Sequence, residues 1–504
     1  MIESVRARGS APCYADSQHT ELSFSDALLR TIALSRPLER ALSDRTNVGV
    51  LLPPMVPSVL ANLALTLLGR VPVNLNYTAS AAIVDYCIAK AEIDTVVTSR
   101  AALERIPLRP NAKLIYLEDL RDQVSTGDKI TAAALSRAPI GIMQRSFPGL
   151  RVDLDDTAAI IFTSGSTGTP KGVELSHRNL LSNTNQIRHH LSFEPGETLL
   201  GILPLFHCTG YTLTLWMTTI IGLRSVYHFS PLDYRAVGEL CEHYGVTLLL
   251  TAPTFARTYL DRCPPEQFAT VNKFIFGAEK LKPELARQVQ ETFGVDPIEG
   301  YGCSECSPVI AANAPGRIRL GAAGYALPGT ELKTTNPESG EDLEGSEVGL
   351  IWARGPQVMK GYLGDPEATA AAVVDGWYCT GDIGRIDVDG FLHILDRFSR
   401  FSKIGGEMVG HAGVETAIRE AVGVTESEVG VTAVPDAKRG ERLVVIHVGL
   451  DPKQVVSALG DLDIPKLWIP SASDFVEIDE LPVLGTGKAD LKRLRELAME
   501  RLSG

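Results

Sequence analysis

The sequence predicts an α/β fold with more than one domain, and three observations support this. The chain has 504 residues, whereas single hydrophobic cores stop growing near about 250–300 residues. Short apolar runs alternate with amphipathic stretches and turn signals, which is typical of strands and helices that follow one another. Hydrophobic residues make up 44% and charged residues 22% of the chain, which is ordinary for a globular protein.

Several segments carry clear secondary-structure signals. Residues 48–52 form an apolar run that ends at two prolines and predict a buried strand, and residues 58–68, closed by a glycine, predict a helix. Residues 246–250 and 273–276 predict further strands. The acid-rich stretch 336–347 predicts an exposed turn between strands.

Charge and cysteine usage exclude several function classes. The formal net charge of −13 argues against a nucleic-acid partner, because no basic surplus exists to release counterions. Among the eight cysteines only Cys303 and Cys306 form a CxxC pair, and a second pair that a zinc site needs is missing. This usage indicates a reducing cytoplasm, and the N-terminal residues contain no hydrophobic signal core.

Two long uncharged runs are candidates for membrane-spanning helices. They cover residues 46–69 and 198–223. Prolines interrupt the first, and a histidine, a glycine and several threonines dilute the second, whereas a membrane helix needs about 20 predominantly apolar residues. We therefore expect no transmembrane segment, and interpret both runs as buried core and pocket wall.

The most informative segment is residues 161–172, Ile-Phe-Thr-Ser-Gly-Ser-Thr-Gly-Thr-Pro-Lys-Gly. It concentrates hydroxyls, glycines and one lysine in a single loop after an apolar run. Such a loop is suited to polyphosphate, because glycines let backbone N–H groups approach an anion and hydroxyls donate to phosphate oxygens. It is not a Walker loop: a proline precedes Lys171, and the chain after Gly172 reads as extended rather than helical.

This loop resembles the phosphate-loop signature of the adenylate-forming superfamily, which includes acyl-CoA synthetases, luciferases and peptide-synthetase adenylation domains. The resemblance covers roughly residues 47–494. It implies activation of a carboxylic acid with ATP to acyl-AMP and pyrophosphate, followed by transfer to a thiol. The phosphate contacts that it implies come from Thr163, Ser164, Gly165, Ser166, Thr167, Gly168 and Lys171.

Further motifs resemble the family's nucleotide and metal site. Residues 301–305, Tyr-Gly-Cys-Ser-Glu, imply that Tyr301 and Gly302 line the adenine, that Ser304 contacts the α-phosphate and that Glu305 ligates Mg²⁺. The stretch Gly277, Ala278, Glu279 resembles the edge of the adenine pocket. The family's Trp-x-x-Thr-Gly-Asp motif ends here at Asp382, which implies hydrogen bonds to both ribose hydroxyls, with Arg397 as a second contact.

The resemblance also implies two domains and a rotation between them. We expect a large adenylate-forming domain over residues 1–396, with mixed sheets and helices, and a small mobile α+β domain over 397–504. Ser399 stands at the hinge position, where the family usually has Asp or Lys. Lys488 is the expected catalytic lysine of adenylation, and Lys403, Gly405 and Gly406 are expected to line the thiol channel after rotation.

The motifs say less about which carboxylic acid is the substrate and which thiol is the acceptor. Residues 204–216, with His207, Cys208 and Gly210, resemble the wall of an acyl pocket, and no acidic residue lies between Leu199 and Leu223 to hold a substrate ammonium. We expect a hydrophobic acid, with a fatty acid as the first candidate. An aryl or other specialised-metabolite acid, or a product that is not a thioester, stays an alternative.

The greatest likeness is to the acyl-carrier-protein synthetase half of bifunctional bacterial acyltransferases. Coenzyme A and the phosphopantetheine of an acyl carrier protein both stay open as acceptors. A carrier protein is acidic and needs a basic docking patch. Six residues near the hinge could form that patch or could be solvated charges: Arg397, Arg400, Lys403, Lys438, Arg439 and Arg442.

Overall fold

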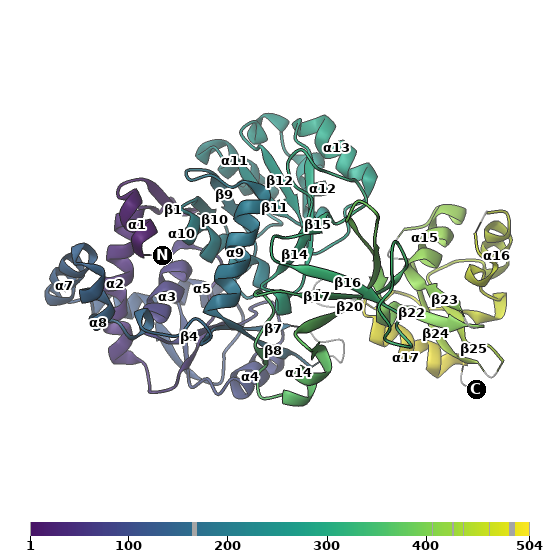
Figure 1. The fold of residues 1–504 in the computed structure, drawn as a ribbon, viewed down its shortest axis with the longest axis horizontal. Coiled ribbons are helices and arrows are strands. Elements are labelled where there is room, and N and C mark those ends of the chain that lie inside the picture. The colour runs from purple at the N-terminus through teal and green to yellow at the C-terminus, as the bar shows by residue number, and fades with distance from the viewer. Residues whose placement is uncertain are drawn as a thin grey trace. The chain divides into compact units, whose positions relative to one another are not determined.

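The chain forms two compact units in this computed structural model, which describes residues 2–163, 169–405, 407–425, 428–436, 438–462, 464–482 and 489–502. Unit 1 comprises residues 1–333, 352–380 and 386–393, and unit 2 comprises 334–351, 381–385 and 394–504. Figure 1 shows parallel strands and helices alternating along unit 1. The α/β class predicted from the sequence is therefore confirmed.

A nine-stranded sheet forms the centre of unit 1, in the order β15-β14-β13-β12-β11-β9-β10-β1-β2. The strands from β13 to β1 pair in parallel, and antiparallel strands close both edges. Its members are β1 (Pro12–Asp16), β2 (Glu21–Ser23), β9 (Thr198–Gly201), β10 (Arg224–Tyr227), β11 (Leu248–Thr251), β12 (Lys273–Phe276), β13 (Pro297–Gly302), β14 (Val309–Ala312) and β15 (Tyr325–Ala326). Strands β9 and β11 are buried along their whole length, as parallel strands covered on both faces must be.

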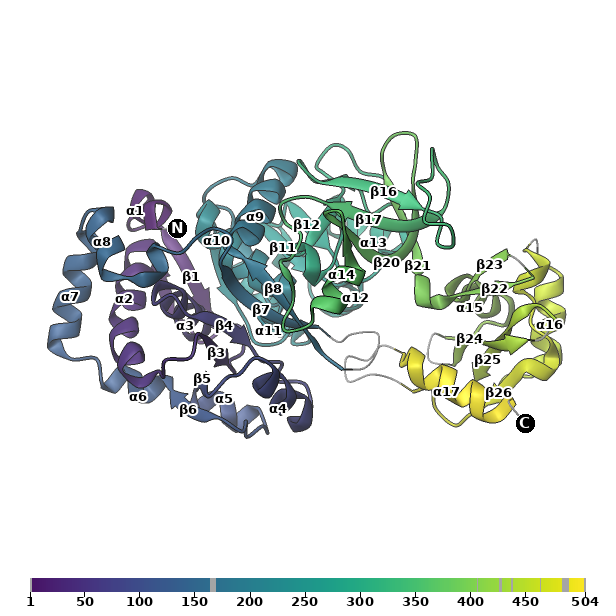
Figure 2. The same ribbon diagram turned by 60° about the horizontal axis from the view of Figure 1, so that its bottom comes forward.

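Helices and two smaller sheets complete unit 1. A parallel sheet β4-β3-β5-β6 comprises Val71–Asn74, Asn47–Val50, Thr95–Thr98 and Lys113–Tyr116, and a second sheet β18-β8-β7 comprises Gly361–Tyr362, Lys171–Ser176 and Thr157–Thr163. Helix α2 (Phe24–Ala41) lies between α3 (Val56–Leu67) and α7 (Thr126–Arg137) in both views (Figures 1 and 2). The other helices are α1 (Ile2–Arg8), α4 (Ala81–Lys90), α5 (Arg100–Arg105), α6 (Leu117–Asp122), α8 (Ile140–Ser146), α9 (His177–Leu191), α10 (Thr218–Ile221), α11 (Tyr234–Tyr244), α12 (Pro253–Arg262), α13 (Pro283–Phe293) and α14 (Pro366–Ala372).

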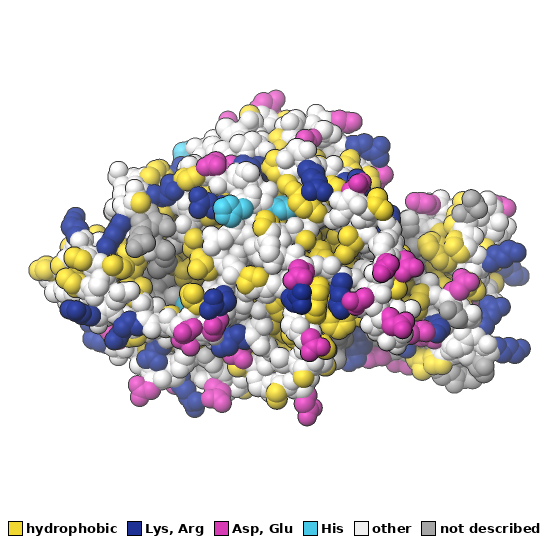
Figure 3. All heavy atoms as spheres, viewed as in Figure 1, with side chains coloured by type: hydrophobic (Ala, Val, Ile, Leu, Met, Phe, Trp, Pro, Cys, Tyr) yellow, Lys and Arg dark blue, Asp and Glu magenta, His cyan; other side chains and the backbone are white. Residues whose placement is uncertain are grey.

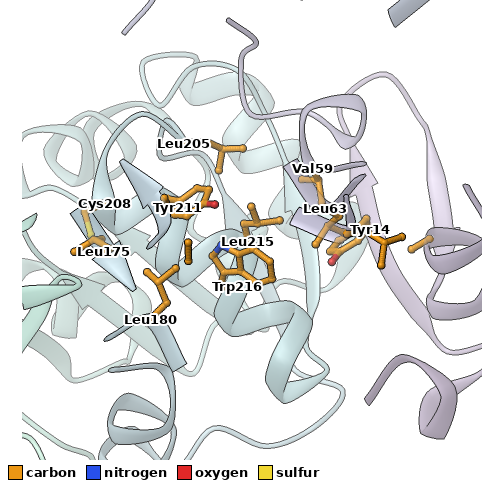
Figure 4. Packing of buried hydrophobic residues seen from close by; sticks show 14 of the residues in the cluster. Tyr14, Val59, Leu63, Leu175, Leu180, Leu205, Cys208, Tyr211, Leu215 and Trp216 are labelled. Atoms are coloured by element: carbon orange, nitrogen blue, oxygen red, sulfur yellow. The ribbon is translucent and has the colours of Figure 1, made fainter. Parts of the chain in front are cut away.

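One hydrophobic cluster joins helix α3 to the long uncharged segment after β9. Figure 4 shows Val59 and Leu63 of α3 beside Tyr14, with Tyr211 and Trp216 of the π-helical segment η2 (Gly210–Met217) on the other side. Every residue of η2 is buried. Because this segment lacks charges, it can be enclosed completely without an ion-pair partner. The run is core, as predicted, and no helix among the described residues is long and apolar enough to cross a membrane.

A five-stranded sheet has the order β16-β17-β20-β19, and β21 also pairs with β20. Its strands are β16 (Glu331–Thr335), β17 (Gly349–Arg354), β20 (Trp377–Ile386), β19 (Val373–Val374) and β21 (Leu392–Arg397). The acid-rich stretch 336–347 connects β16 to β17 and is largely exposed, as the sequence predicted.

Unit 2 contains its own sheet, β23-β22-β25-β24, with β26 alongside β25. The strands are β22 (Phe401–Ile404), β23 (Glu407–Gly410), β24 (Val429–Asp436), β25 (Gly440–His447) and β26 (Phe475–Glu477), and the helices are α15 (His411–Val422), α16 (Pro452–Gly460) and α17 (Leu491–Leu502). Val414, Ile418, Val431 and Val445 form a core between this sheet and its helices. The division at residue 396 that we expected stays a prediction.

The predicted elements agree with the structure apart from their ends. The strand and helix expected over 48–52 and 58–68 are β3 and α3, and the two later strands are β11 and β12. Strand β22, which begins at Phe401, is one element for which we had no expectation from the sequence. Its alternating exposure, with Ser402 and Ile404 buried, explains why it pairs as a strand.

Candidate active site

The phosphate-loop segment connects two antiparallel strands. Thr163 at the end of β7 pairs with Lys171 at the start of β8, so the loop closes a hairpin. Ser164, Gly165, Ser166, Thr167 and Gly168 lie outside the described residues. The strand after Gly172 agrees with the sequence prediction that this is not a Walker loop, which would lead into a helix.

The predicted metal ligand and the phosphate-loop lysine meet at one tyrosine. The hydroxyl of Tyr362 donates a hydrogen bond of 2.9 Å to Oε1 of Glu305. The ammonium Nζ of Lys171 lies 4.7 Å from the centroid of the same ring, a cation–π contact. Three segments far apart in the sequence therefore converge on Tyr362.

Backbone contacts fix this arrangement. Tyr362 lies on β18, which pairs with β8 through Gly361 to Glu174 and Tyr362 to Val173. The N–H of Met359 donates to the carbonyl of Glu305 at 2.8 Å, which ties the same segment to the turn that carries the carboxylate. Glu305 itself lies in the 3₁₀ turn Ser304–Cys306.

Electrostatics keep Tyr362 a hydrogen-bond donor. Burial, and to a smaller extent the charge of Glu305, raises the pKa of Tyr362 well above its usual value. Tyr378 is 5% exposed, and burial raises the pKa of Tyr378 well above its usual value too. Both phenols therefore stay neutral at physiological pH, and Tyr362 can donate to the Glu305 carboxylate.

The Tyr301–Gly302 motif has a steric reason as well. A Cβ at Gly302 would lie 1.9 Å from the carbonyl oxygen of Pro308, so only glycine fits at this point of β13. Tyr301 pairs with Ala311 of β14, and its side chain packs against the main cluster of unit 1. These contacts set the path of the chain into the Ser304–Cys306 turn.

The predicted edge of the adenine pocket follows β12. Ala278 has φ +67°, a left-handed conformation that is uncommon for a residue with a side chain. Strain of this kind costs on the order of 1 kcal/mol or more and concentrates at functional sites. The carboxylate of Glu279 is engaged elsewhere: its Oε2 accepts from the N–H of Thr254 at 3.3 Å and from its hydroxyl at 2.6 Å, at the start of α12.

The predicted acyl wall contacts the Glu305 turn. The thiol of Cys208 is buried and donates to the carbonyl oxygen of Ser304, with Sγ and O 3.7 Å apart. Burial raises the pKa of Cys208 to about 12, so it is a neutral thiol. Gly210 is required here, because a Cβ would lie 2.1 Å from the carbonyl oxygen of Pro204. His207 is exposed, with its ring 4.5 Å from that of Phe206.

The two predicted ribose ligands lie together in unit 2. Nε of Arg397 is 2.9 Å from Oδ1 of Asp382. The Asp382 side chain is only 7% exposed whereas that of Arg397 is 57% exposed. A buried carboxylate needs a partner, and Arg397 supplies one from the solvent side. The sequence named both residues but did not predict that they pair.

The hinge and channel residues are also placed in unit 2. Ser399 is exposed in the 3₁₀ turn Phe398–Arg400, and Lys403 lies on β22 with its ammonium paired to Glu338. Gly405 has φ +61°, which suits glycine. Gly406 and Lys488 lie outside the described residues, so their predicted roles stay predictions.

The six basic residues near the hinge do not form the free patch that we considered. Four of them are paired with acids of the same unit: Arg397 with Asp382, Arg400 with Glu415, Lys403 with Glu338 and Arg442 with Asp474. Arg400 and Glu415 are 2.6 Å apart and largely buried. These contacts neutralise most of the charge that a strongly acidic partner would need.

Comparison with known proteins shows the family of this chain. The AMP-binding enzyme family matches the chain over residues 2–363. The chain belongs to this family. This chain is 33% identical over 352 residues to the long-chain-fatty-acid–CoA ligase of Bacillus subtilis, and the match covers 68% of this chain and 62% of that protein. It thus spans less than two thirds of that relative. It is 31% identical over 383 residues to the feruloyl-CoA synthase of an Amycolatopsis species, covering 73% and 76%.

Solved structures support the fold of this AMP-binding enzyme. The crystal structure of ATP-bound MatB from Rhodopseudomonas palustris has a TM-score of 0.81 and 26% identity, and the match covers 98% of this chain and 97% of that one. The o-succinylbenzoate CoA synthetase of Bacillus subtilis, solved with its acyl-adenylate, also gives 0.81, at 23% identity and 98% and 97% coverage. Both confirm the α/β fold across nearly the whole chain.

The residues around Glu305 fit a magnesium ion held together with a nucleotide. No group of three or more His, Cys, Asp or Glu side chains in the described part of this AMP-binding enzyme could hold a metal by itself. Mg²⁺ typically takes only one or two carboxylates and completes its shell with water and substrate phosphates. Glu305, partly exposed in a turn beside Lys171 and Tyr362, supplies such a carboxylate.

Proposed function

We propose that this protein is an AMP-forming acid–thiol ligase. It activates a hydrophobic carboxylic acid with ATP, releases pyrophosphate and passes the acyl group from acyl-AMP to a thiol. The observation that carries the proposal is the meeting of Lys171, Glu305 and the acyl-wall residue Cys208 around Tyr362 and Ser304. This meeting supports the proposal, because a lysine, a carboxylate and the apolar wall lie next to one another.

In this proposal the residues act by charge and position. Lys171 neutralises phosphate oxygens, and Ser304 contacts the α-phosphate. Glu305 holds Mg²⁺, which when bound neutralises the negative charge of the phosphates. Tyr362 fixes the carboxylate of Glu305 through its hydroxyl and holds Lys171 against its ring. Asp382 and Arg397 position the ribose, and Gly277, Ala278, Tyr301 and Gly302 line the base.

The acyl wall favours an acid without a positive charge. Residues 199–223 contain no acidic side chain, and η2 is buried throughout. A substrate ammonium would remain unpaired there, which costs several kcal/mol. The relatives named for long-chain fatty acid and for ferulate leave two hydrophobic classes. We propose a fatty acid first and an aryl acid as the second candidate.

We propose coenzyme A as the acceptor. The relatives are CoA ligases by name, and the paired basic residues of unit 2 give an acidic carrier protein little free charge to bind. Of the six basic residues near the hinge, Lys438 and Arg439 form no ion pair with a described residue. These two cations are therefore the ones that could bind an acidic carrier protein. The likeness to carrier-protein synthetases therefore stays the less supported alternative.

Two conformations serve the two half-reactions in this proposal. A small domain over residues 397–504 rotates against the domain over 1–396, with Ser399 at the hinge. Lys488 bridges the substrate carboxylate and the α-phosphate during adenylation. After rotation, Lys403, Gly405 and Gly406 line the channel through which the thiol reaches the acyl-AMP.

The acceptor is tested by supplying coenzyme A and holo-acyl carrier protein separately to the enzyme with ATP and a fatty acid. Thioester is expected with coenzyme A and little with the carrier protein. Lys438→Glu with Arg439→Glu should leave both outputs unchanged. The contrary result has two parts, both measured at low salt, where electrostatic attraction between the proteins is strongest. The native enzyme would transfer the acyl group efficiently to the carrier protein, and the double variant would not, which would establish the carrier protein as acceptor.

A further inference from the structure

A surface on helices α7 and α8 of unit 1 has no role in the proposed reaction. Figure 3 shows hydrophobic side chains gathered over these helices, at the left of the view, with Lys and Arg side chains beside them. We call it the α7–α8 surface. It consists of the exposed residues Lys129, Ile130, Ala134, Arg137, Ile140, Ile142 and Arg145.

The isoleucines of this surface are not part of the core. Ile130 is 66% exposed, Ile142 47% and Ile140 37%. Helix α7 already has an apolar face toward the protein, where Ala132 and Leu135 are buried. Ile130 and Ala134 lie four residues apart on the opposite face, so they form a second apolar stripe. Large apolar side chains gathered on an exposed face indicate an interaction site.

The charge of the surface has one sign. No acidic residue occurs between Lys129 and Val152, whereas this stretch contains Lys129, Arg137, Arg145 and Arg151. None of these four cations forms an ion pair with a residue that the structure describes. The rest of the protein is acidic, since the formal net charge of the whole chain is −13.

Two of the acids that flank this stretch, Asp128 and Asp155, are paired within the protein, whereas Asp153 and Asp156 form no ion pair with a described residue. Oδ2 of Asp128 lies 3.1 Å from the guanidinium of Arg40, and Asp128 also caps α7 through Ser125. Oδ1 of Asp155 lies 2.6 Å from the guanidinium of Arg178. The α7–α8 surface therefore carries only positive charges, its nearest acid on the N-terminal side is paired, and the unpaired acids lie beyond its C-terminal end.

Apolar side chains among unpaired cations fit an anionic lipid surface. Peripheral helices bury such side chains at the headgroup boundary, while Lys and Arg attract the anionic headgroups. A protein partner fits less well, because protein interfaces draw much of their energy from Trp and Tyr anchors, and this surface contains neither. The single aromatic residue between 126 and 152 is Phe147, which is buried.

We propose that the α7–α8 surface docks this protein reversibly on anionic lipid bilayers. This goes beyond the proposed function and does not depend on it, since binding is measured without substrate. The full-length protein is sedimented with vesicles of phosphatidylcholine alone or with about one third phosphatidylglycerol. Binding to the anionic vesicles is expected to be more than about tenfold stronger, and to weaken as salt rises.

Two sets of variants locate the binding. Ile130→Ser with Ile142→Ser, and separately Lys129→Glu with Arg145→Glu, should each weaken vesicle binding by about tenfold or more. All four positions are exposed, so folding should be preserved, and an unchanged melting temperature checks this. Matched controls are Arg235→Glu with Arg257→Glu, exposed arginines of α11 and α12, and Val388→Ser, an exposed valine of unit 1.

The controls should bind like the native protein. The proposal is overturned if the native protein stays in the supernatant, if neutral and anionic vesicles bind it equally, or if the α7–α8 variants bind as well as the controls. Binding lost equally in the arginine control would show a general charge effect and would overturn it too. Adenylation of a short water-soluble acid should be unchanged in every variant.

Discussion

The hydroxyl of Tyr362 lies 2.9 Å from Oε1 of Glu305, while the ring of the same tyrosine lies 4.7 Å from the ammonium of Lys171. One side chain thus contacts both the residue proposed to hold the metal and the residue proposed to hold phosphate. A hydrogen bond to a charged carboxylate contributes about 1.5–3 kcal/mol. Tyr362 is therefore a positioning residue for both.

Tyr362→Phe should lower acid-dependent pyrophosphate exchange by about tenfold to a hundredfold, because the hydroxyl that orients Glu305 is lost while the ring over Lys171 remains. The Mg²⁺ concentration for half-maximal activity should rise. Steady-state exchange rates at several Mg²⁺ concentrations check this. Tyr325→Phe, which removes a hydroxyl elsewhere in unit 1, should have native kinetics; an equal loss in both variants would remove Tyr362 from the site.

Asp382→Asn tests the ribose assignment. An amide accepts through one oxygen only, whereas a carboxylate accepts through both, and Asn also loses the charge pairing with Arg397. The KM for ATP should therefore rise by about tenfold. The preference for ATP over 2′-deoxy-ATP should shrink toward unity. Asp389→Asn, a surface aspartate whose Oδ2 lies 2.7 Å from Arg319, is the control. Native discrimination against the deoxynucleotide in Asp382→Asn would contradict the assignment.

Lys488→Ala should separate the half-reactions. Losing the cation between carboxylate and α-phosphate should cut acyl-AMP formation by about 10²–10³. Thioester formation from preformed acyl-AMP should survive, as rapid-quench assays of each half-reaction can determine. Lys492→Ala, an exposed lysine of α17, should be native in both.

The reverse pattern is expected for Gly406→Leu, which should retain pyrophosphate exchange and lose thioester output. If both half-reactions fell together in folded Lys488→Ala and Gly406→Leu proteins, the two-conformation proposal would fail.

Glu299 gives a pH prediction. It is 7% exposed on β13, and burial raises the pKa of Glu299 to about 7, although the N–H of Leu281 donates to its Oε1 at 3.1 Å. Folding therefore favours the protonated acid. Its contribution to the free energy of unfolding is complete below about pH 4.5 and is lost as pH rises to about 7, by about 3 kcal/mol in total.

Glu299→Gln should remove this loss. Relative to the native protein, its stability should increase between about pH 5 and 7.5, as urea unfolding at a series of pH values can measure. Glu284→Gln, at an exposed position, should follow the native curve. If the free energy of unfolding changed with pH in the same way in the native protein and in Glu299→Gln, the pKa of Glu299 would not be raised by folding.

Much of the fold could be predicted because the signals are local. The strand β12 consists of a lysine followed by three apolar residues, and helix α3 lies in an uncharged run closed by Gly69. Helix and strand ends differ by a few residues, because they depend on caps and pairing partners rather than on composition. The strand β22, Phe-Ser-Lys-Ile, was missed because a serine and a lysine dilute its apolar signal, although its partner β23 follows directly in the chain.

The site was predictable where chemistry is written into short motifs. Lys171, Glu305 and Asp382 each stand in such a motif. Tyr362 was missed because its role arises from the pairing of β18 with β8, which no local pattern indicates. Its sequence context, a tyrosine after Gly361, is typical of an ordinary turn or short strand.

Acid-dependent exchange of labelled pyrophosphate into ATP tests the central claim most directly. A panel of fatty, aryl and amino acids is supplied with Mg²⁺ and no thiol, to the native protein and to Glu305→Gln. We predict exchange with hydrophobic acids, none with amino acids, and a loss of at least about 10² in Glu305→Gln. Exchange that no acid in the panel stimulates, or that Glu305→Gln retains in full, would contradict the account.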